Sequence, residues 1–315
     1  MGWVCPMCSS NNESSERACM VCGETRPGIG LSFDIQSQVN SASGSFSSLL
    51  NAYKSVNVES EFDNALDMIK SNPRAGFEKM LECAKRGYPP AQNEVGDCYY
   101  YGIGVSQDFS QAVLWFEKAA QQDIRQAQYN LGFCYYHGKG TYKNHATAVL
   151  WYKKAAEAGH TGAQNELGDC YYFGAGIEKD PEKAFLWYKK AAEQGNATGE
   201  FNMGFCYLRG VGTAVDEGKA FEYFTKSAAQ GNLDAENAVG ECYYNGYGVS
   251  KSTKKAIEHY TIAANGGSSK AQYSLGFCYE KGHGILHSKR KAIEWYTKAA
   301  EQGHEEARKA LERLK

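Results

Sequence analysis

The chain has few of the features that would place it in a membrane or outside the cell. No apolar run is long enough to span a bilayer, and the first residues, MGWVCPMC, have neither the basic segment nor the apolar core of a signal peptide. The formal net charge of −2 gives no bulk attraction to nucleic acid or to an anionic membrane. We therefore expect a cytoplasmic protein, with the nucleus as the alternative, that does not bind membranes and for which nucleic acid is not favoured as a partner.

Catalytic motifs are also missing. There is no His-Glu-x-x-His, no Gly-x-Ser-x-Gly and no P-loop, and the seven histidines lie mostly in expected turns. Proline is scarce (6) while glycine is abundant (34), which argues against a proline-rich disordered chain. We expect a folded protein that is not an enzyme.

A strict internal repeat of 36 residues occupies most of the chain. Each unit contains Leu-Gly-x-Cys-Tyr or a close variant, then Gly-x-Gly, then an alanine followed three residues later by a ring. Six copies follow one another without an insertion, which identifies an array of repeats rather than one globular core. The repeated glycine occupies positions 96, 132, 168, 204, 240 and 276.

Each unit is predicted to form two helices. In residues 163–173, Ala163, Leu167 and Cys170 recur at helical spacing and form one apolar stripe. Gly168 lies beside this stripe and is expected to allow a close approach of the neighbouring helix. The Gly-x-Gly should end this first helix, and a second helix is predicted over 180–194, with Trp187 on its inner face.

The repeat resembles the Sel-1-like repeat, a relative of the tetratricopeptide repeat. The shared pattern is Ala-x-x-x-Leu-Gly-x-x-Tyr, Gly-x-Gly, and Lys-Ala-x-x-Trp-Tyr-x-Lys-Ala-Ala-x-x-Gly, as at 163–195. Because one helix pair cannot bury both of its stripes, stacked pairs should form an all-α, right-handed α-solenoid. The resemblance implies an adaptor or scaffold that holds partner proteins in complexes. A lone helix over 304–314 is expected to cap the array.

One cysteine in each repeat raises the question of disulfides or metal binding. Equivalent cysteines would lie a full helix pair apart, too far for the Cα separation of about 6 Å that a disulfide requires. We therefore interpret them as small apolar residues packed in the seam between helices. They are Cys98, Cys134, Cys170, Cys206, Cys242 and Cys278.

Two positions on the first helix of each repeat alternate between polar and aromatic residues, so the true period is 72 residues. The two positions are four residues apart and share one helix face, which lines the concave groove in tetratricopeptide arrays. The polar pairs are Asn93/Asp97, Asn165/Asp169 and Asn237/Glu241, and the aromatic pairs are Tyr129/Phe133, Phe201/Phe205 and Tyr273/Phe277.

Two interpretations of this alternation stay open. An extended peptide could place apolar side chains on the aromatic pairs and basic or amide groups on the acidic ones. Alternatively, the rings pack on neighbouring helices and the polar pairs form hydrogen bonds there, without binding anything. Complete burial of Phe133, Phe205 and Phe277 would exclude the first interpretation.

The first residues predict a zinc site. Cys5-x-x-Cys8, ten residues, and Cys19-x-x-Cys22 supply four thiolates at the spacing that tetrahedral Zn²⁺ requires. Four protein ligands leave no open position for a catalytic water, so one structural Zn²⁺ is expected. A segment this small has almost no core, and metal binding would supply its folding energy.

With Trp3 and Asn12, these cysteines complete the pattern Trp-x-Cys-x-x-Cys-x-x-x-Asn-x6-Cys-x-x-Cys, which resembles the Ran-binding-protein-2 type of zinc finger. Ubiquitin-binding members have Thr-Phe where this chain has Ser9-Ser10, so the hydroxyl is kept and the ring is lost, while Val21 stays apolar. RNA-binding members have an aromatic residue and arginines where this chain has serine and glutamate. A protein ligand such as ubiquitin, a stabilising role and an RNA-associated role remain alternatives.

The chain is thus expected to have three parts: a zinc finger over 1–27, a serine-rich linker over 28–58 and a repeat array over 59–315. The array would include a degenerate first helix pair before the six clear repeats. The leading function is a non-catalytic adaptor that binds proteins through the array and through the finger. An accessory subunit of an enzyme complex is an alternative that these residues do not separate from the adaptor.

Overall fold

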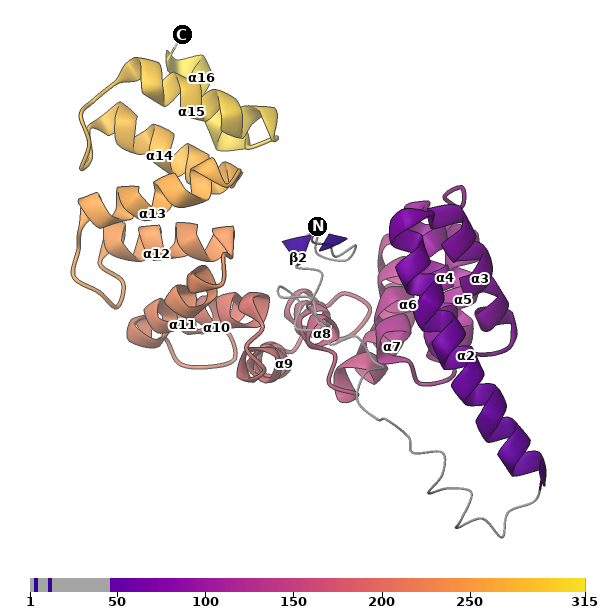
Figure 1. Ribbon diagram of the computed structural model, residues 1–315. Helices are drawn as coiled ribbons and strands as arrows, with labels where there is room; N and C mark the ends of the chain where they lie inside the picture. Colours follow the sequence, from indigo (N-terminus) through magenta and orange to yellow (C-terminus); the bar gives the residue numbers. More distant parts are fainter. Residues whose placement is uncertain (1–2, 5–10, 13–45, 315) are drawn as a thin grey trace. The chain divides into compact units, whose positions relative to one another are not determined.

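The computed structural model describes residues 3–4, 11–12 and 46–314, and side chains from residue 57 onward. From residue 46 the chain folds into consecutive α-helices joined by short turns (Figure 1). The helices are α2 (Phe46–Ser71), α3 (Pro73–Lys85), α4 (Pro89–Tyr101), α5 (Phe109–Ala120), α6 (Arg125–His137), α7 (His145–Glu157), α8 (Thr161–Phe173), α9 (Pro181–Glu193), α10 (Ala197–Arg209), α11 (Glu217–Ala229), α12 (Leu233–Asn245), α13 (Thr253–Asn265), α14 (Ser269–Lys281), α15 (Lys289–Glu301) and α16 (Glu305–Leu314).

From α2 to α7 and from α9 to α16, the helices pack in sequence order, each against its neighbours along the chain. They form two compact units, one made of Met1–Cys170 with Ala175–Glu178, the other of Tyr171–Gly174 with Lys179–Lys315. In the first unit α4 packs on α5, α5 on α6 and α6 on α7, and the second unit continues in the same way from α9 to α16. This is the α-solenoid of stacked helix pairs that the sequence predicts. We call α4, α6, α8, α10, α12 and α14 the A helices, and α5, α7, α9, α11, α13 and α15 the B helices.

The core of a repeat is built from small residues on the A helix and a ring on the B helix. Ala127, Leu131 and Cys134 of α6 are all 0% exposed. A Cβ added to Gly132 would lie 2.6 Å from Cδ1 of Tyr152, which is itself fully buried on α7. The expected role of this glycine as a point of close helix contact is therefore confirmed.

The two glycines of Gly-x-Gly have different tasks. Gly138 has a φ of 70°, and its N–H donates to the carbonyl of Cys134, so it ends α6 in the left-handed conformation that glycine adopts most easily. Gly140, also at positive φ, lies against the backbone of the preceding B helix, where a Cβ would meet the Phe109 carbonyl. The second glycine thus sets how closely one repeat approaches the previous one, a role that the sequence analysis did not assign.

Helix α2 begins at Phe46, well inside the predicted linker 28–58, and continues without a break to Ser71. Because the segment 46–58 lacks a clear apolar stripe, the sequence indicates only a short helix near Leu49–Tyr53 within it, and the observed helix is longer at both ends. Residues 28–45 lie outside the described part of the chain.

The last described helix is α16, and it lies where the sequence predicts a lone helix over 304–314. Ala307 and Ala310 are buried against α15, while Arg313 donates two hydrogen bonds of 2.7 Å to the carboxylate of Glu280. Burial opposes ionisation of Glu280, but hydrogen bonds from Lys281, Arg313 and Tyr296 lower its pKa to about 2. None of the helices that the structure describes is both long enough and apolar enough to cross a bilayer.

Candidate functional site

The alternating pairs lie on the A helices, one turn apart, as their spacing predicts. Their exposure differs by type: Asn93, Asn165 and Asn237 are 4%, 6% and 3% exposed, while their acidic partners are half-buried. All six rings of the aromatic pairs are half-buried. Because Phe133, Phe205 and Phe277 keep part of their surface accessible, the condition that would exclude a binding role is not met.

The first and third polar pairs form hydrogen bonds within their own A helix and with the next A helix. The Nδ2 of Asn93 donates to Asp97 at 3.1 Å, and the Nδ2 of Asn130 on α6 donates both to Asp97 at 3.1 Å and to Asn93 at 3.2 Å. In the second unit Asn237 donates to Glu241 at 2.8 Å. For these asparagines, therefore, the packing interpretation describes the structure, and only the carboxylates remain accessible.

The rings of the first aromatic pair pack against other rings of the protein and remain half-buried. Tyr129 stacks on the ring of His160, with centroids 4.5 Å apart and planes 16° apart. Phe133 contacts Tyr100 of the preceding A helix edge to face at 6.4 Å and the ring of His137 at 4.2 Å.

The aromatic pairs of the second unit have similar contacts. Tyr273 stacks on His304, with ring centroids 4.7 Å apart and planes 15° apart. Phe201 packs against Phe224 of α11, with centroids 5.7 Å apart and planes tilted by 45°. The protein itself thus occupies one side of each of these rings.

A cavity of about 180 Å³ lies between the first polar pair and the first aromatic pair, on α4 and α6 with the B-helix residue Phe116 as its base. Three of its lining residues, Asp97, Tyr129 and Phe133, are among the predicted site residues. The others were missed by the sequence analysis. The full lining is Asp97, Tyr100, Tyr101, Phe116, Tyr129, Asn130 and Phe133.

Asp169 is predicted to be the equivalent of Asp97 one 72-residue period later, and it lies at the same repeat position, on α8 rather than α4. The cavity beside Asp97 does not include it. It is half-buried, and its charge acts on Glu166 of its own helix. Burial, with a smaller contribution from Asp169, raises the pKa of Glu166 to about 7. A ligand contact at Asp169 therefore stays a prediction, without the cavity that supports one at Asp97.

The missed tyrosine Tyr100 has a signal in the sequence. It recurs as Tyr172 and Tyr244 at the same 72-residue period as the alternating pairs, and Tyr172 contacts Phe205 edge to face at 5.7 Å. Burial, with the nearby Cys134 and Asp97, raises the pKa of Tyr100. Its hydroxyl therefore stays protonated at neutral pH and can donate a hydrogen bond to a ligand.

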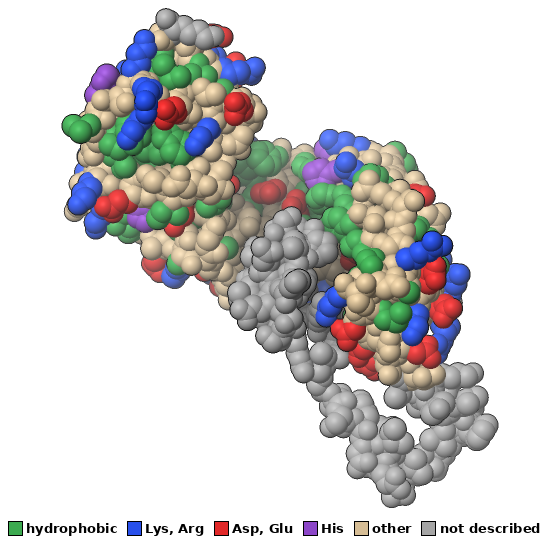
Figure 2. Space-filling model, turned by 45° about the horizontal axis from the view of Figure 1, so that its top comes forward, with side chains coloured by type: hydrophobic (Ala, Val, Ile, Leu, Met, Phe, Trp, Pro, Cys, Tyr) green, Lys and Arg blue, Asp and Glu red, His purple; other side chains and the backbone are tan. Residues whose placement is uncertain are grey.

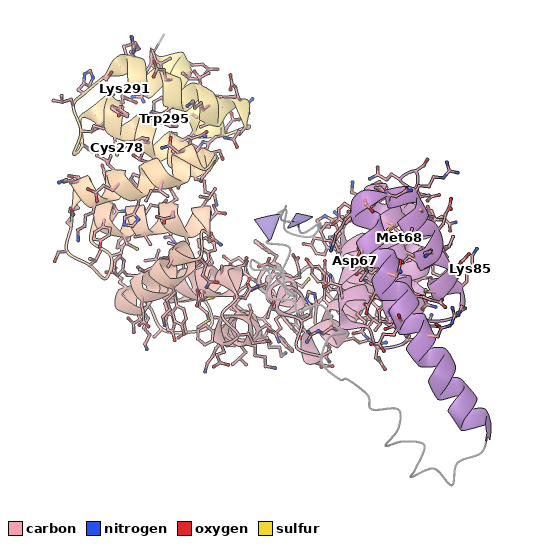
Figure 3. The ribbon with its side chains drawn as sticks, viewed as in Figure 1. Asp67, Met68, Lys85, Cys278, Lys291 and Trp295 are labelled. Atoms are coloured by element: carbon pink, nitrogen blue, oxygen red, sulfur yellow. The ribbon has the colours of Figure 1, made fainter. Side chains whose placement is uncertain are left out.

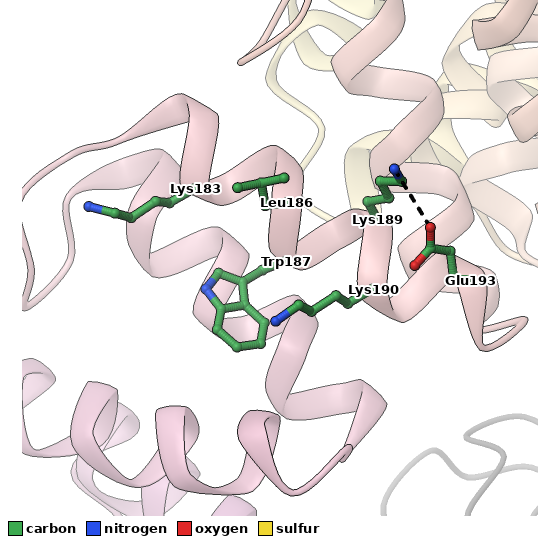
Figure 4. Close-up of a pocket in the computed structure, with 6 residues that line it drawn as sticks. All are labelled: Lys183, Leu186, Trp187, Lys189, Lys190 and Glu193. Carbon is green, nitrogen blue, oxygen red and sulfur yellow. Dashed lines mark ion pairs between the residues drawn. The ribbon is translucent and has the colours of Figure 1, made fainter.

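The B helices present a different surface. Trp187 is half-buried rather than on the inner face of α9 as predicted, and the Nζ of Lys190 lies 3.9 Å from its ring centroid. Both line a pocket of about 340 Å³ beside α9, and the Nζ of Lys189 lies 3.7 Å from the carboxylate of Glu193 in the same lining. Figure 4 labels these side chains and marks the ion pair. Such Lys–Trp contacts recur on α5, α7 and α15. Because the contact recurs in so many repeats, it indicates a shared way of covering tryptophan rather than a specific binding site.

The repeat cysteines are buried, free thiols, as the packing interpretation expects. The six are at most 3% exposed, and Cys278, labelled on α14 in Figure 3, is 1% exposed. Burial, with a smaller contribution from Asp97, raises the pKa of Cys134 to about 12. These thiols are therefore protonated and unreactive in the folded protein.

The predicted zinc ligands Cys5, Cys8, Cys19 and Cys22, and the residues Ser9, Ser10 and Val21, lie outside the described residues. The two short strands near them are described. β1 (Trp3–Val4) pairs antiparallel with β2 (Asn11–Asn12), with Trp3 opposite Asn12. In the sequence these two strands stand on either side of the first Cys-x-x-Cys, and the zinc site itself stays a prediction.

Surface charge is mixed rather than segregated on the face that Figure 2 shows. Lysine and arginine side chains lie among aspartate and glutamate, and several pair along one helix, such as Lys226 with Glu222 at 2.8 Å. This pattern agrees with the net charge of −2.

Comparison with known proteins identifies the family. The Sel1 repeat model matches six consecutive segments, 89–124, 125–160, 161–196, 197–232, 233–268 and 269–304. A Sel1 repeat protein from Oxalobacter formigenes is 30% identical, with a TM-score of 0.72 over 76% of this chain and 96% of that one. A protective antigen of uropathogenic Escherichia coli with an SLR fold is 33% identical, with a TM-score of 0.70 over 86% of this chain.

The chain therefore belongs to the Sel1 repeat family. It spans 59% of the length of the Escherichia coli antigen, and no curated protein matches it. Sel1 repeat proteins are generally scaffolds for interactions between proteins, and their solenoid fold is typically not catalytic.

Proposed function

We propose that this protein is a non-catalytic scaffold that binds partner proteins through its A helices. The binding surface, which we call the A-helix face, consists of the half-buried rings of the aromatic pairs, the acidic residues between them and the cavity beside Asp97. The observation that carries the proposal is this cavity, because it lies at the predicted pairs and is lined mainly by accessible aromatic side chains.

The composition of the A-helix face supports a protein ligand. Tyrosine and phenylalanine are enriched at protein interfaces, where they bury a large area at low cost in conformational entropy. Tyr129 and Phe133 are already held by contacts with His160 and Tyr100, so little further ordering is needed on binding. Rings that are held by neighbouring rings and are still partly accessible suit a pre-organised binding surface.

We further propose that residues 1–27 form a zinc finger, with Cys5, Cys8, Cys19 and Cys22 holding one structural Zn²⁺. The finger would be a second module for binding proteins, with ubiquitin as one candidate ligand. Joined to the solenoid by a chain segment, it would raise the effective concentration of a second contact on the same partner.

The experiment is quantitative affinity capture from extract with the full chain and two triple variants. Phe133→Ser, Phe205→Ser and Phe277→Ser together remove one ring from each aromatic pair of the A-helix face. Leu114→Ser, Leu150→Ser and Leu186→Ser remove three exposed leucines at one equivalent position of the B helices, and they are the matched control.

We expect the ring variant to lose partners that the wild type and the leucine control both retain. Far-UV circular dichroism melts of all three proteins establish that each is folded at the temperature of capture. If the ring variant keeps every partner, or the leucine control loses the same ones, the A-helix face is not the binding surface.

A further inference from the structure

The cavity on α4 and α6 is unlike an ordinary apolar pocket because its walls combine ring faces with a carboxylate. Tyr100, Tyr101, Tyr129 and Phe133 surround it as half-buried rings, and fully buried Phe116 closes its base. On one side lies the carboxylate of Asp97, oriented by the amide of Asn130 at 3.1 Å. Aromatic faces carry negative electrostatic potential, and a carboxylate adds to it, so the walls favour a cation.

The chain itself places cations against rings of this group. In the first unit the Nζ of Lys139 lies 5.3 Å from the ring centroid of Phe109, which in turn contacts Tyr100 edge to face at 5.0 Å. In the second unit the Nζ of Lys281 lies 5.9 Å from the ring centroid of Phe277. The Nζ of Lys179, in the loop after α8, likewise lies 5.6 Å from the ring centroid of Tyr172, which is the equivalent of Tyr100 one 72-residue period later. Basic side chains of the chain itself therefore lie against several rings at or beside these positions.

The second unit also shows what kind of side chain fits between the two rings. Tyr244 and Phe277 occur 144 residues after Tyr100 and Phe133, at equivalent repeat positions. There the ring of His283 contacts both, with centroids 5.9 Å from each, and its Nδ1 lies 2.5 Å from the Tyr244 hydroxyl in a hydrogen bond. A planar, nitrogen-containing side chain of the same chain occupies this place.

In the first unit the equivalent loop residue is Lys139, which lies over Phe109, and the cavity beside Tyr100 keeps about 180 Å³. This volume corresponds to about six water molecules at roughly 30 Å³ each. It is large enough for the planar end of an arginine side chain. The guanidinium can stack on a ring and donate two hydrogen bonds to a carboxylate, which an ammonium cannot do with the same geometry.

We infer that this cavity binds an arginine side chain of a partner protein, stacked on one of the rings that line it and hydrogen-bonded to Asp97. The inference rests on the proposed function, because it names the chemistry that the A-helix face recognises. It predicts that positive charge and planarity are both needed at the position that enters the cavity.

The probes are two short peptides, acetyl-Gly-Arg-Gly-amide and its citrulline counterpart, which has the same shape without the charge. Binding to the full chain is measured by ligand-observed saturation-transfer NMR with a concentration series up to the millimolar range. The citrulline peptide should bind on the order of tenfold more weakly. Equal binding of the two peptides, or no binding of either, would overturn the inference.

The variants locate the binding. Asp97→Asn removes the charge with little change of shape, and Tyr101→Leu removes one ring. Each variant should bind the arginine peptide several-fold more weakly than the wild type. Tyr142→Leu is the matched control, since Tyr142 is 71% exposed on a loop of the same unit and does not line the cavity. A melt of each variant shows whether it is folded, and Asp97→Asn provides the test if Tyr101→Leu unfolds.

The two proposals fail in different ways. If the ring variant loses its partners in the capture experiment while arginine and citrulline peptides bind equally, the scaffold function stands and the arginine assignment is wrong. If the arginine peptide binds the wild type and all cavity variants alike, the cavity is not its site. If capture is also unchanged, the A-helix face has no binding role.

Discussion

At the scale of single residues, the contact between Gly132 and Tyr152 decides how closely α6 and α7 pack. The equivalent glycines Gly96, Gly204 and Gly240 face a ring in the same way, with an added Cβ lying 2.5 to 2.6 Å from it. A glycine inside a helix costs about 1 kcal/mol relative to alanine. The position is nevertheless glycine, because the ring of the B helix fills the space that a methyl group would need.

Replacing Gly132 by alanine should therefore destabilise the protein. The gain in helix propensity is about 1 kcal/mol, while forcing a methyl group against a fully buried ring costs about 1–3 kcal/mol. Gly218→Ala is the matched control, because Gly218 is exposed in α11 and an added Cβ meets only Asp216 at 3.5 Å. In thermal melts the first variant should unfold at a lower temperature than the wild type and the second at a higher one. The same direction for both would contradict this account.

The cysteines give a second prediction at this scale. Of the eleven, seven are buried free thiols between Cys83 and Cys278, and four are the proposed zinc ligands. In the zinc-loaded protein a thiol reagent should modify none of them quickly. A chelator should expose four, and denaturant the remaining seven. Rapid reaction of a repeat cysteine in the folded protein would show that the packing interpretation is incomplete.

At the scale of helices, the joints between repeats explain why the solenoid keeps its period. A buried glutamine at the start of an A helix donates its Nε2 to a carbonyl near the end of the preceding helix. The bonds are Gln92 to Ala84 at 3.2 Å, Gln128 to Ala120 at 3.3 Å, Gln164 to Ala156 at 3.2 Å and Gln272 to Ala264 at 3.2 Å. Each adds a second hydrogen bond to a carbonyl at the end of a helix that already accepts the backbone N–H three residues further on.

His160 caps the start of α8, and this capping depends on the protonation state of its ring. Its Nδ1 accepts from the N–H of Ala163 at 3.0 Å at the start of α8, and its Nε2 lies 3.0 Å from the side-chain oxygen of Gln126. Only the neutral ring can accept and donate in this way. Burial, with the nearby charge of Arg125, lowers the pKa of His160 to about 3. The ring is therefore neutral in the folded protein over the whole physiological range.

This lowered pKa predicts a loss of stability in acid. The unfolded state binds a proton near pH 6.5 and the folded state only near pH 3, so the contribution of His160 is complete above pH 6.5 and decreases by up to about 1.4 kcal/mol per pH unit below it. His160→Asn keeps a capping side chain, because Asn196 and Asn232 cap the equivalent helices. Denaturant melts should show the wild type losing its advantage over this variant between pH 6.5 and 4. A constant difference would contradict the assignment.

Much of the architecture was predictable from residue spacing. The stripe of Ala127, Leu131 and Cys134 and the helix end at Gly138 follow from local chemistry, so both helices of each repeat were located within a few residues. The cavity was only partly predictable. Asp97 and Phe133 were found through their alternation, but Phe116 reaches the cavity from another helix, and its place depends on how closely the helices pack.

At the scale of the whole molecule, the zinc finger and the solenoid are proposed as separate modules. Among the residues whose side chains are described, the buried core begins with Val58 and Phe62 of α2, and Val58 stands 36 positions after Cys22, the last proposed zinc ligand. Treatment with a chelator should release one zinc ion per chain and leave the thermal unfolding of the helices unchanged. Atomic spectroscopy and circular dichroism measure the two quantities on one sample. A large shift of the melt would show that the solenoid depends on the finger.

The central claim is that partners bind the A-helix face, and site-specific photocrosslinking tests it most directly. Benzoylphenylalanine is introduced in the full chain in place of Tyr101, at the cavity, or in place of Tyr142, which is the more exposed of the two. The account predicts that light links a partner protein to position 101 and not to position 142. Equal adducts at both positions, or an adduct at position 142 alone, would contradict it.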